Sequence, residues 1–109
     1  MTRVEFFDHE GRITGFCCSG HSGYAEEGSD IVCASVTSVI YSALNGIENV
    51  LHIPFGYETG DGYLRAVMPD DIIDTQIKHI NILLESMYQF LIQLSEQYPD
   101  NVSVSELEV

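Results

Sequence analysis

Apolar residues along the chain fall into short strand-like runs separated by two longer helical repeats. Residues 4–7 and 13–18 are rich in β-branched and aromatic residues and flank a polar turn at residues 8–12. This pattern predicts a β-hairpin. Residues 19–29 follow, and they contain three glycines. We predict a loop there, and its length in so small a domain is typical of a functional loop.

Both helical repeats have recognisable ends. The first begins near Asp30, whose carboxylate, like the hydroxyl of Ser29, can accept a hydrogen bond from a backbone N–H of the first turn. It extends to about His52, where a proline and a glycine follow. The second covers residues 71–98, and a proline ends it. Its apolar stripe, in steps of three and four, consists of Ile73, Ile77, Ile80, Leu84, Met87, Leu91, Leu94 and Tyr98, and Leu83 and Phe90 widen it.

The remaining segments complete the order of elements. Residues 55–58 and 63–68 flank a glycine-containing turn at residues 59–62, which predicts a second hairpin. Residues 102–107 alternate between apolar and polar, which predicts a last strand. The order is therefore ββαββαβ. Both helical stripes are buried most simply if the two helices pack on one face of a mostly antiparallel sheet. We therefore predict a single α+β domain over residues 1–109.

Acidic residues dominate the charge of the chain. Its 109 residues include 17 Asp and Glu against 4 Lys and Arg, for a formal net charge of −13. Such a surface repels nucleic acid and anionic membranes, because both are bound through cations. It complements a basic partner, although acidity also serves solubility alone. We therefore expect neither direct nucleic-acid binding nor membrane binding.

The N-terminus and the cysteines indicate the compartment. Residues 1–9 carry charges where a secretory signal needs an apolar run, and the longest apolar runs fall far short of a membrane span. The three cysteines, Cys17, Cys18 and Cys33, are an odd number, which favours free thiols in a reducing compartment. We expect a cytoplasmic protein.

One pair of residues has the properties needed for nucleophilic catalysis. His21 opens the glycine-rich loop, and Cys33 lies in the first turn of the predicted helix. Cysteine attacks as the thiolate, which the positive end of a helix dipole and a nearby imidazolium both stabilise. The carboxylate of Asp30 opposes this if it lies close to the sulfur. Backbone N–H groups of the same turn are suitable donors for an oxyanion hole.

Each of these residues also has a plainer interpretation. Cys33 is alternatively a small buried apolar residue, and Asp30 a helix cap rather than a third catalytic member. Thr37, one turn after the cysteine, either faces the site or bonds back to a carbonyl of its own helix. A zinc site built from all three cysteines and His21 is the other alternative. It is disfavoured because adjacent strand residues point to opposite faces and no Cys-x-x-Cys occurs.

The loop and the start of the helix together resemble a known family signature. Residues 20–25 (GHSGYA), Gly28 and residues 30–34 (DIVCA) are similar to the signature of the ribosomal-processing cysteine proteases, the Prp family. The order of elements fits this family over nearly the whole chain. The signature is specific, since it includes a histidine and a cysteine at a fixed separation. Ser22 stands where the family usually has Ala, and Thr37 stands where it usually has Ser and keeps the hydroxyl.

The resemblance implies a cytoplasmic cysteine endopeptidase that removes a short N-terminal extension from a basic large-subunit ribosomal protein, number twenty-seven, during ribosome assembly. It places the nucleophile at Cys33, the base at His21 and supporting positions at Gly20, Asp30 and Thr37. It also implies a homodimer and a mobile loop between the base and the nucleophile.

Two further expectations accompany this assignment. We expect that the reaction needs no metal or organic cofactor. The width of the second apolar stripe, around Phe90, is a separate reason to expect a homodimer. The alternative from another functional class is a non-catalytic, ribosome-associated binding module.

Overall fold

The computed structural model describes residues 1–21, 23–26 and 30–109. Its elements are β1 (Thr2–His9), β2 (Arg12–Ser19), α1 (Ile31–Asn45), a π-helical turn η1 (Gly46–Val50), β3 (Tyr57–Gly60), β4 (Tyr63–Val67), α2 (Asp74–Gln97) and β5 (Val102–Glu108). The predicted order ββαββαβ is confirmed. The strands form one sheet in the order β3-β4-β2-β1-β5, antiparallel throughout except for the parallel pair β1 and β5.

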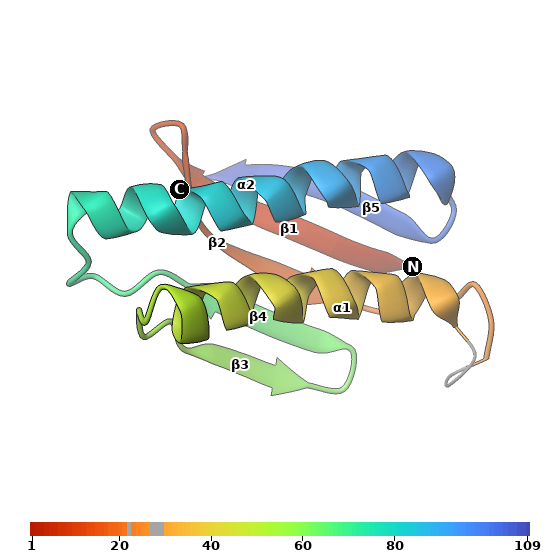
Figure 1. Cartoon of the computed structure of the whole chain (residues 1–109). Coiled ribbons are helices and arrows are strands. Elements are labelled where there is room, and N and C mark those ends of the chain that lie inside the picture. Colours follow the sequence, from red (N-terminus) through yellow and green to blue (C-terminus); the bar gives the residue numbers. More distant parts are fainter. Residues whose placement is uncertain (22, 27–29) are drawn as a thin grey trace.

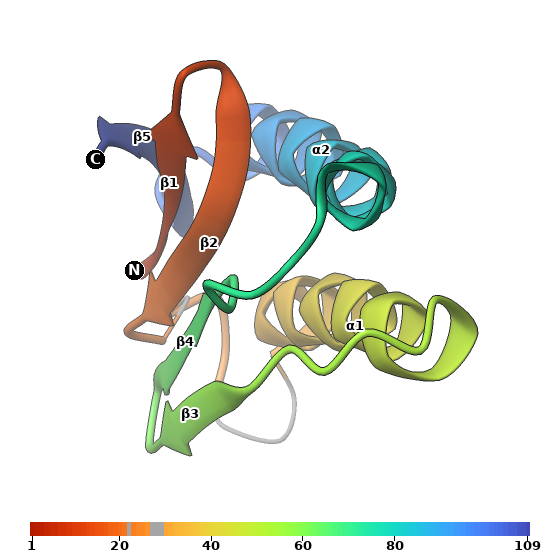
Figure 2. The same ribbon diagram turned by 90° about the vertical axis from the view of Figure 1, so that its left-hand side faces the viewer.

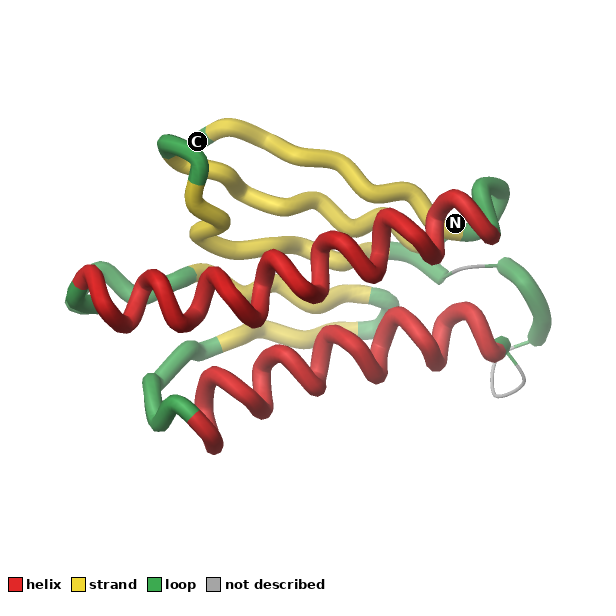
Figure 3. The backbone as a smooth tube through the Cα atoms, turned by 45° about the horizontal axis from the view of Figure 1, so that its top comes forward, coloured by secondary structure: helices red, strands yellow, loops and turns green. Residues whose placement is uncertain are grey.

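Both helices cover the same face of this sheet. Figures 1 and 2 show α1 and α2 together on one side, with the other side of the sheet uncovered. The two helices lie side by side over the sheet and run roughly along the direction of the strands (Figure 3). The predicted α+β fold, with two helices packed on one face of a mostly antiparallel sheet, is therefore confirmed.

The core lies between the sheet and the helices. The sheet contributes Val4, Phe6, Phe16, Leu64, Ala66 and Val102, and the helices contribute Val32, Val36, Ile40, Leu44, Ile80, Leu84, Met87, Leu91 and Leu94. Each large apolar side chain buried in this way contributes roughly 1.5–3 kcal/mol. This packing holds α1, and with it the turn that carries Cys33, over the sheet.

Both hairpin turns are tighter than predicted. β1 and β2 join at Glu10 and Gly11, which have φ values of 52° and 81°. Positive φ at both central residues is typical of two-residue hairpin turns. β3 and β4 join at Asp61 and Gly62, and only the glycine has positive φ, at 60°. β3 begins two residues later than predicted, because Phe55 enters the core ahead of the strand and is 1% exposed.

The boundaries and the outer face of α2 also differ from the prediction. Ile73 precedes the helix, is 63% exposed, and donates its N–H to the side chain of Gln76 at 3.2 Å. The apolar stripe is therefore shorter than expected. Leu91, a member of the stripe, is buried. Of the two residues expected to widen the stripe, Leu83 packs partly buried against the core and Phe90 is 45% exposed.

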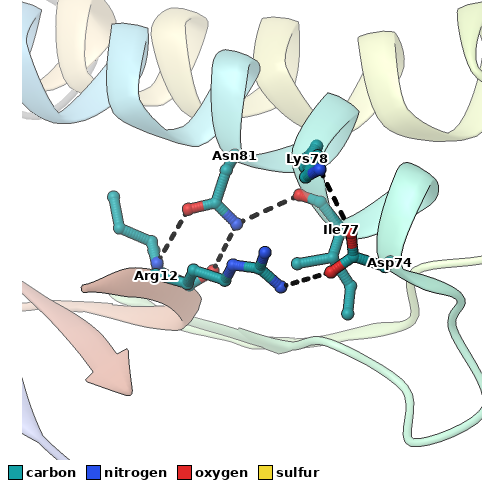
Figure 4. Close-up of polar contacts among 6 residues, drawn as sticks. Arg12, Asp74, Ile77, Lys78 and Asn81 are labelled. Carbon is teal, nitrogen blue, oxygen red and sulfur yellow. Dashed lines mark hydrogen bonds and ion pairs between the residues drawn. The ribbon is translucent and has the colours of Figure 1, made fainter. Parts of the chain in front are cut away.

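Side-chain hydrogen bonds and an ion pair connect α2 to the β1–β2 hairpin. Asn81 accepts a hydrogen bond from the N–H of Ile13 at 2.9 Å and donates to its carbonyl at 3.1 Å (Figure 4). Because β4 does not extend this far along β2, the amide replaces a strand partner. Asp74 contacts Arg12 at 2.8 Å and Lys78 at 3.2 Å. Hydrogen bonds from these two cations lower the pKa of the Asp74 carboxyl.

The helical segment Ile31–Val50, which combines α1 and η1, ends two residues short of the predicted His52. By length and composition it is apolar enough to cross a membrane, with a mean hydropathy of 1.3 over the best window. The expectation from the sequence rests only on uninterrupted apolar runs, and these are expected to be too short to span a membrane. A core helix meets the same criterion, and this segment buries one face, formed by Val32, Val36, Ile40, Ala43, Leu44 and Ile47.

Candidate active site

Cys33 is the third residue of α1, and Asp30 caps this helix. The backbone of Asp30 is extended, with φ −81° and ψ 98°. Its Oδ1 accepts a hydrogen bond of 2.8 Å from the N–H of Cys33, and its Oδ2 accepts one of 3.3 Å from the N–H of Tyr24. Asp30 is thus a helix cap, and it also ties the preceding loop to the turn that carries the thiol.

The cap determines which N–H groups of the first turn are available to a substrate. The N–H of Cys33 is engaged by Asp30, and the N–H of Ala34 donates to the Asp30 carbonyl at 3.1 Å. A helix provides no acceptor for its first N–H groups. Among the described residues, Ile31 and Val32 therefore supply the first-turn donors that neither the cap nor the helix engages.

His21 follows β2 and lies against the turn between β3 and β4. The N–H of Gly20 donates to the carbonyl of Gly62 at 2.8 Å. Gly20 has φ 86°, and a Cβ there would collide with the carbonyl oxygen of Met1, so this position needs glycine. A Cβ on Gly62 would lie 2.9 Å from Nε2 of His21. Oδ1 of Asp61 is 3.6 Å from the same nitrogen.

His21 and Cys33 line the same two cavities. The smaller, of about 250 Å³, has an apolar wall formed by Val36, Ile40, Tyr41, Tyr63 and Leu64. The larger, of about 430 Å³, has small side chains in its lining at Gly23, Ala25 and Ala34. Gly20 lines the first cavity, Asp30 the second, and Thr37 both. The fold therefore brings all five predicted site residues to this pair of cavities.

Thr37 does not make the bond expected of a hydroxyl turned back onto its own helix. Within the described part of the chain, its side chain makes no hydrogen bond to the carbonyl of Cys33. Ser35 makes the equivalent bond instead, because its Oγ donates to the carbonyl of Ile31 at 2.7 Å. The plainer interpretation of Thr37 was therefore wrong, and its exposed side chain borders both cavities.

The other two cysteines lie in settings unlike that of Cys33. Burial raises the pKa of the Cys18 thiol to about 11, and Cys17 and Cys33 add to the increase. Burial also raises the pKa of Cys17, while Arg65 opposes the increase. Cys18 lines the smaller cavity but is a protonated thiol at neutral pH. Cys33 is the cysteine that lies at a helix N-terminus.

A zinc site is not formed by the residues that the structure describes. Among them, no group of three or more histidine, cysteine, aspartate or glutamate side chains is placed to hold a metal ion. Cys17 and Cys18 are successive residues of β2 and so point to opposite faces of the sheet. The four ligands of the zinc alternative do not converge.

The sequence did not identify Asp61 and Gly62 as neighbours of His21. An Asp-Gly pair predicts a tight turn, but nothing in the sequence relates that turn to a histidine far earlier in the chain. The proximity follows from the pairing of β2 with β4, in which Ser19 lies opposite Tyr63. The expected mobile loop falls partly on residues 22 and 27–29, which lie outside the described residues.

Comparison with known proteins bears on both the fold and the site. The family described as cysteine protease Prp matches residues 1–103. A ribosomal processing cysteine protease Prp of Bacillus subtilis is 33% identical over an alignment of 103 residues, and this alignment covers 89% of this chain and 88% of the relative. The chain belongs to the cysteine protease Prp family. It is a cysteine-type endopeptidase, as the resemblance of its signature implied.

Solved structures share the fold of this Prp-family chain. A Prp protease of Staphylococcus aureus, solved with a covalently linked product peptide, has a TM-score of 0.83 at 24% identity and covers 98% of this chain and 100% of its own. A protein of Streptococcus mutans has a TM-score of 0.80 at 22% identity, over 100% of this chain and 96% of its own. The ββαββαβ arrangement is therefore the Prp fold.

Proposed function

We propose that this Prp-family protease removes the N-terminal extension of a basic large-subunit ribosomal protein, number twenty-seven, during ribosome assembly. The observation that supports it most is that His21 and Cys33 line the same two cavities, with Cys33 in the first turn of α1. Curated relatives in Bacillus subtilis and Staphylococcus aureus are named as ribosomal processing proteases. That name supports a ribosomal protein as the substrate.

The proposed reaction begins at the sulfur of Cys33. Sγ attacks the carbon of the scissile carbonyl as the thiolate. His21 takes the thiol proton and donates it to the leaving amine, which leaves the substrate as a thioester on Cys33. A water molecule then attacks the thioester as His21 accepts its proton, and the thiol is released. The N–H groups of Ile31 and Val32 are candidate donors to the oxyanion.

Three residues support this pair in the proposal. Gly20 permits the positive φ that brings His21 to the β3–β4 turn. Asp30 holds the N–H of Cys33 and thereby the orientation of the first turn. Thr37 offers a hydroxyl to the substrate from the lining of both cavities. No metal or organic cofactor takes part in the proposed steps.

The two cavities differ in the side chains that they suit. The apolar wall of the smaller cavity, with Tyr41 and Tyr63, matches aromatic or apolar residues before the cut. The glycine and alanine side of the larger cavity permits close approach of a peptide backbone with a small residue at the cut. The net charge of −13 attracts the basic body of the substrate at longer range.

Incubation with the ribosomal precursor, followed by intact-mass analysis, tests this function. We expect the wild type to shorten the precursor by its N-terminal extension. Cys33→Ala should leave the precursor intact, because the attacking atom is gone. Cys18→Ala is a matched control, since Cys18 lines the smaller cavity but lies outside α1, and it should retain activity. A precursor left intact by the wild type would contradict the substrate, and cleavage by Cys33→Ala would contradict the nucleophile.

The family assignment favours an enzyme over the non-catalytic binding module. Alkylation separates the two directly, because a reactive thiolate at Cys33 reacts quickly with dilute iodoacetamide. A buried thiol reacts slowly, and the protonated Cys18 provides the internal comparison. Equal, slow labelling of both residues would support the binding module.

We also propose that the protein is a cytoplasmic homodimer. Ile82 and Phe90 of α2 are 67% and 45% exposed. Phe90 lines a groove of about 460 Å³ together with small residues of α1, among them Ala34 and Ser38. Apolar side chains exposed on neighbouring helices suit a self-complementary interface. The three cysteines are unpaired, which fits a reducing compartment.

A further inference from the structure

The turn between β3 and β4 contacts the proposed base, yet neither the signature nor the proposed reaction assigns it a role. We propose that Asp61 is a positioning residue for His21. It holds the proton-bearing Nε2 of the imidazole, so that Nδ1 exchanges the catalytic proton with Cys33. This rests on the proposed function only in taking His21 as the base.

Three contacts place the turn against the imidazole. Oδ1 of Asp61 is 3.6 Å from Nε2 of His21. The ring lies flush against Gly62, because a Cβ there would be 2.9, 3.3 and 3.4 Å from Nε2, Cδ2 and Cε1. The hydrogen bond of 2.8 Å from the N–H of Gly20 to the carbonyl of Gly62 connects the two backbones. The imidazole is thus held on its Nε2 side by backbone packing and by a carboxylate.

The chemistry of a carboxylate next to Nε2 selects one form of the ring. A neutral imidazole has one N–H and one acceptor nitrogen, and an ionised carboxylate only accepts. Asp61 therefore favours the tautomer with the proton on Nε2, whose lone pair is on Nδ1. When Nδ1 takes the thiol proton, the ring becomes an imidazolium, and the same carboxylate stabilises its charge.

Asp30 does not compete for this role. It lines the larger cavity together with His21, but its two carboxylate oxygens accept the N–H groups of Cys33 and Tyr24. Among the described residues, the carboxylate that forms an ion pair with His21 belongs to Asp61.

The exposure of the pair limits the size of the effect. The side chains of His21 and Asp61 are 55% and 94% exposed. Their separation is longer than a hydrogen bond, and contacts of this kind tighten when substrate binds. Pairs this exposed have modest energies and weaken with salt. The effect should therefore be a few-fold change that is larger at low ionic strength.

Two measurements without substrate test the proposal. Nitrogen-15 NMR of labelled histidine reports the tautomer of His21, and iodoacetamide reports the reactivity of Cys33. Asp61→Ala should move the ring from the Nε2–H tautomer toward a mixture and slow alkylation roughly threefold to fivefold at low salt. Asp61→Asn, which keeps an oxygen acceptor and suits the turn, should give a smaller change, and Asp61→Glu should restore most of the wild-type behaviour. The differences should shrink in high salt.

Glu58→Gln is the matched control. It removes one negative charge from the same hairpin. In the part of the chain that the structure describes, Glu58 forms neither a hydrogen bond nor an ion pair with His21. It should leave both the tautomer and the alkylation rate unchanged. If Asp61→Ala behaves like Glu58→Gln in both measurements, the proposal is wrong. Because neither readout uses a substrate, this result is distinct from a failure to cleave the ribosomal precursor.

Turnover provides a further check with any peptide that the wild type cleaves. Loss of a positioning residue should lower kcat by the same few-fold factor and leave KM within about twofold, since substrate contacts are retained. A rise in KM with unchanged kcat would instead assign Asp61 to substrate binding and overturn the proposal.

Discussion

The backbone N–H of Cys33 donates a hydrogen bond of 2.8 Å to the carboxylate of Asp30. The residue proposed as nucleophile is therefore held by the cap of its own helix. The same carboxylate accepts the N–H of Tyr24 at 3.3 Å, so it connects the loop that follows His21 to the turn that carries the thiol. Helix stability and site geometry depend here on one side chain.

Substitution of Asp30 separates these two contributions. Asp30→Ala removes the cap and should lower the free energy of unfolding by about 1 kcal/mol, measured by urea denaturation. Asp30→Asn keeps an oxygen acceptor and should unfold within a few tenths of a kcal/mol of the wild type. If the cap is the whole role of Asp30, the Asn variant keeps most of its activity. A stable Asn variant that loses about 100-fold or more in kcat/KM would instead make the charge catalytic.

Replacement of His21 tests the base. His21→Ala should lower kcat/KM at pH 7 by at least ~100-fold, the lower end of what positioned proton transfer supplies. Its stability should change little, since the side chain is 55% exposed. His79→Ala is the control, because His79 is also an exposed histidine but lies on α2, away from the site. This variant should be as active as the wild type. A His21→Ala enzyme close to the wild-type rate would remove His21 from the mechanism.

Cys18 should make stability fall at alkaline pH. Its pKa in the folded protein is about 11, above the ordinary 9.0, so the folded state binds the thiol proton more tightly than the unfolded state does. The stabilisation is complete below pH 9 and is lost as the pH rises through 9 toward 11. Two pH units correspond to about 3 kcal/mol at most.

Urea midpoints at pH 8 and pH 10.5 measure this loss. The wild type should lose more stability between the two values than Cys18→Ser, whose hydroxyl does not titrate there. Tyrosines and lysines titrate equally in both proteins, so the difference isolates the thiol. Equal losses would show that the burial of Cys18 does not control its ionisation.

Two separable interactions should recognise the substrate: burial of its aromatic residues and long-range attraction between opposite charges. Replacing the aromatic residues before the cut with Ala should nearly stop cleavage at any salt concentration, because their burial supplies the local affinity. Raising the ionic strength should slow capture of the full-length basic protein much more than capture of a short neutral peptide with the same motif. Both effects are measured as kcat/KM. Equal salt sensitivity would leave the acidic surface as a solubility feature, and indifference to the aromatic residues would reject the specificity.

Light scattering at micromolar concentration tests the dimer. We expect a mass of two 12.2 kDa chains. Phe90→Asp should give monomers, because it places a charge in the exposed apolar surface of α2. Leu107→Asp on β5, where the side chain is 46% exposed, is the control and should leave the dimer intact. A monomeric wild type would contradict the assembly.

Features that depend only on residues close together in the sequence could be predicted from it. The two helical repeats, both hairpins and the order ββαββαβ follow from local periodicity and turn residues. The cap at Asp30 depends on a side chain three residues before Cys33. The signature places His21 and Cys33 in one segment, and the structure brings them to the same cavities.

Strand pairing and burial were decided by the tertiary structure. β5 returns to lie parallel to β1, Phe55 enters the core instead of β3, and Cys18 becomes a partly buried thiol beside the site. Asp61 reaches His21 only because β4 pairs with β2 in one register. That register is selected by which faces of the strands are buried. Which faces are buried depends on helices and strands that are far apart in the chain. A local pattern of residues therefore does not predict the register.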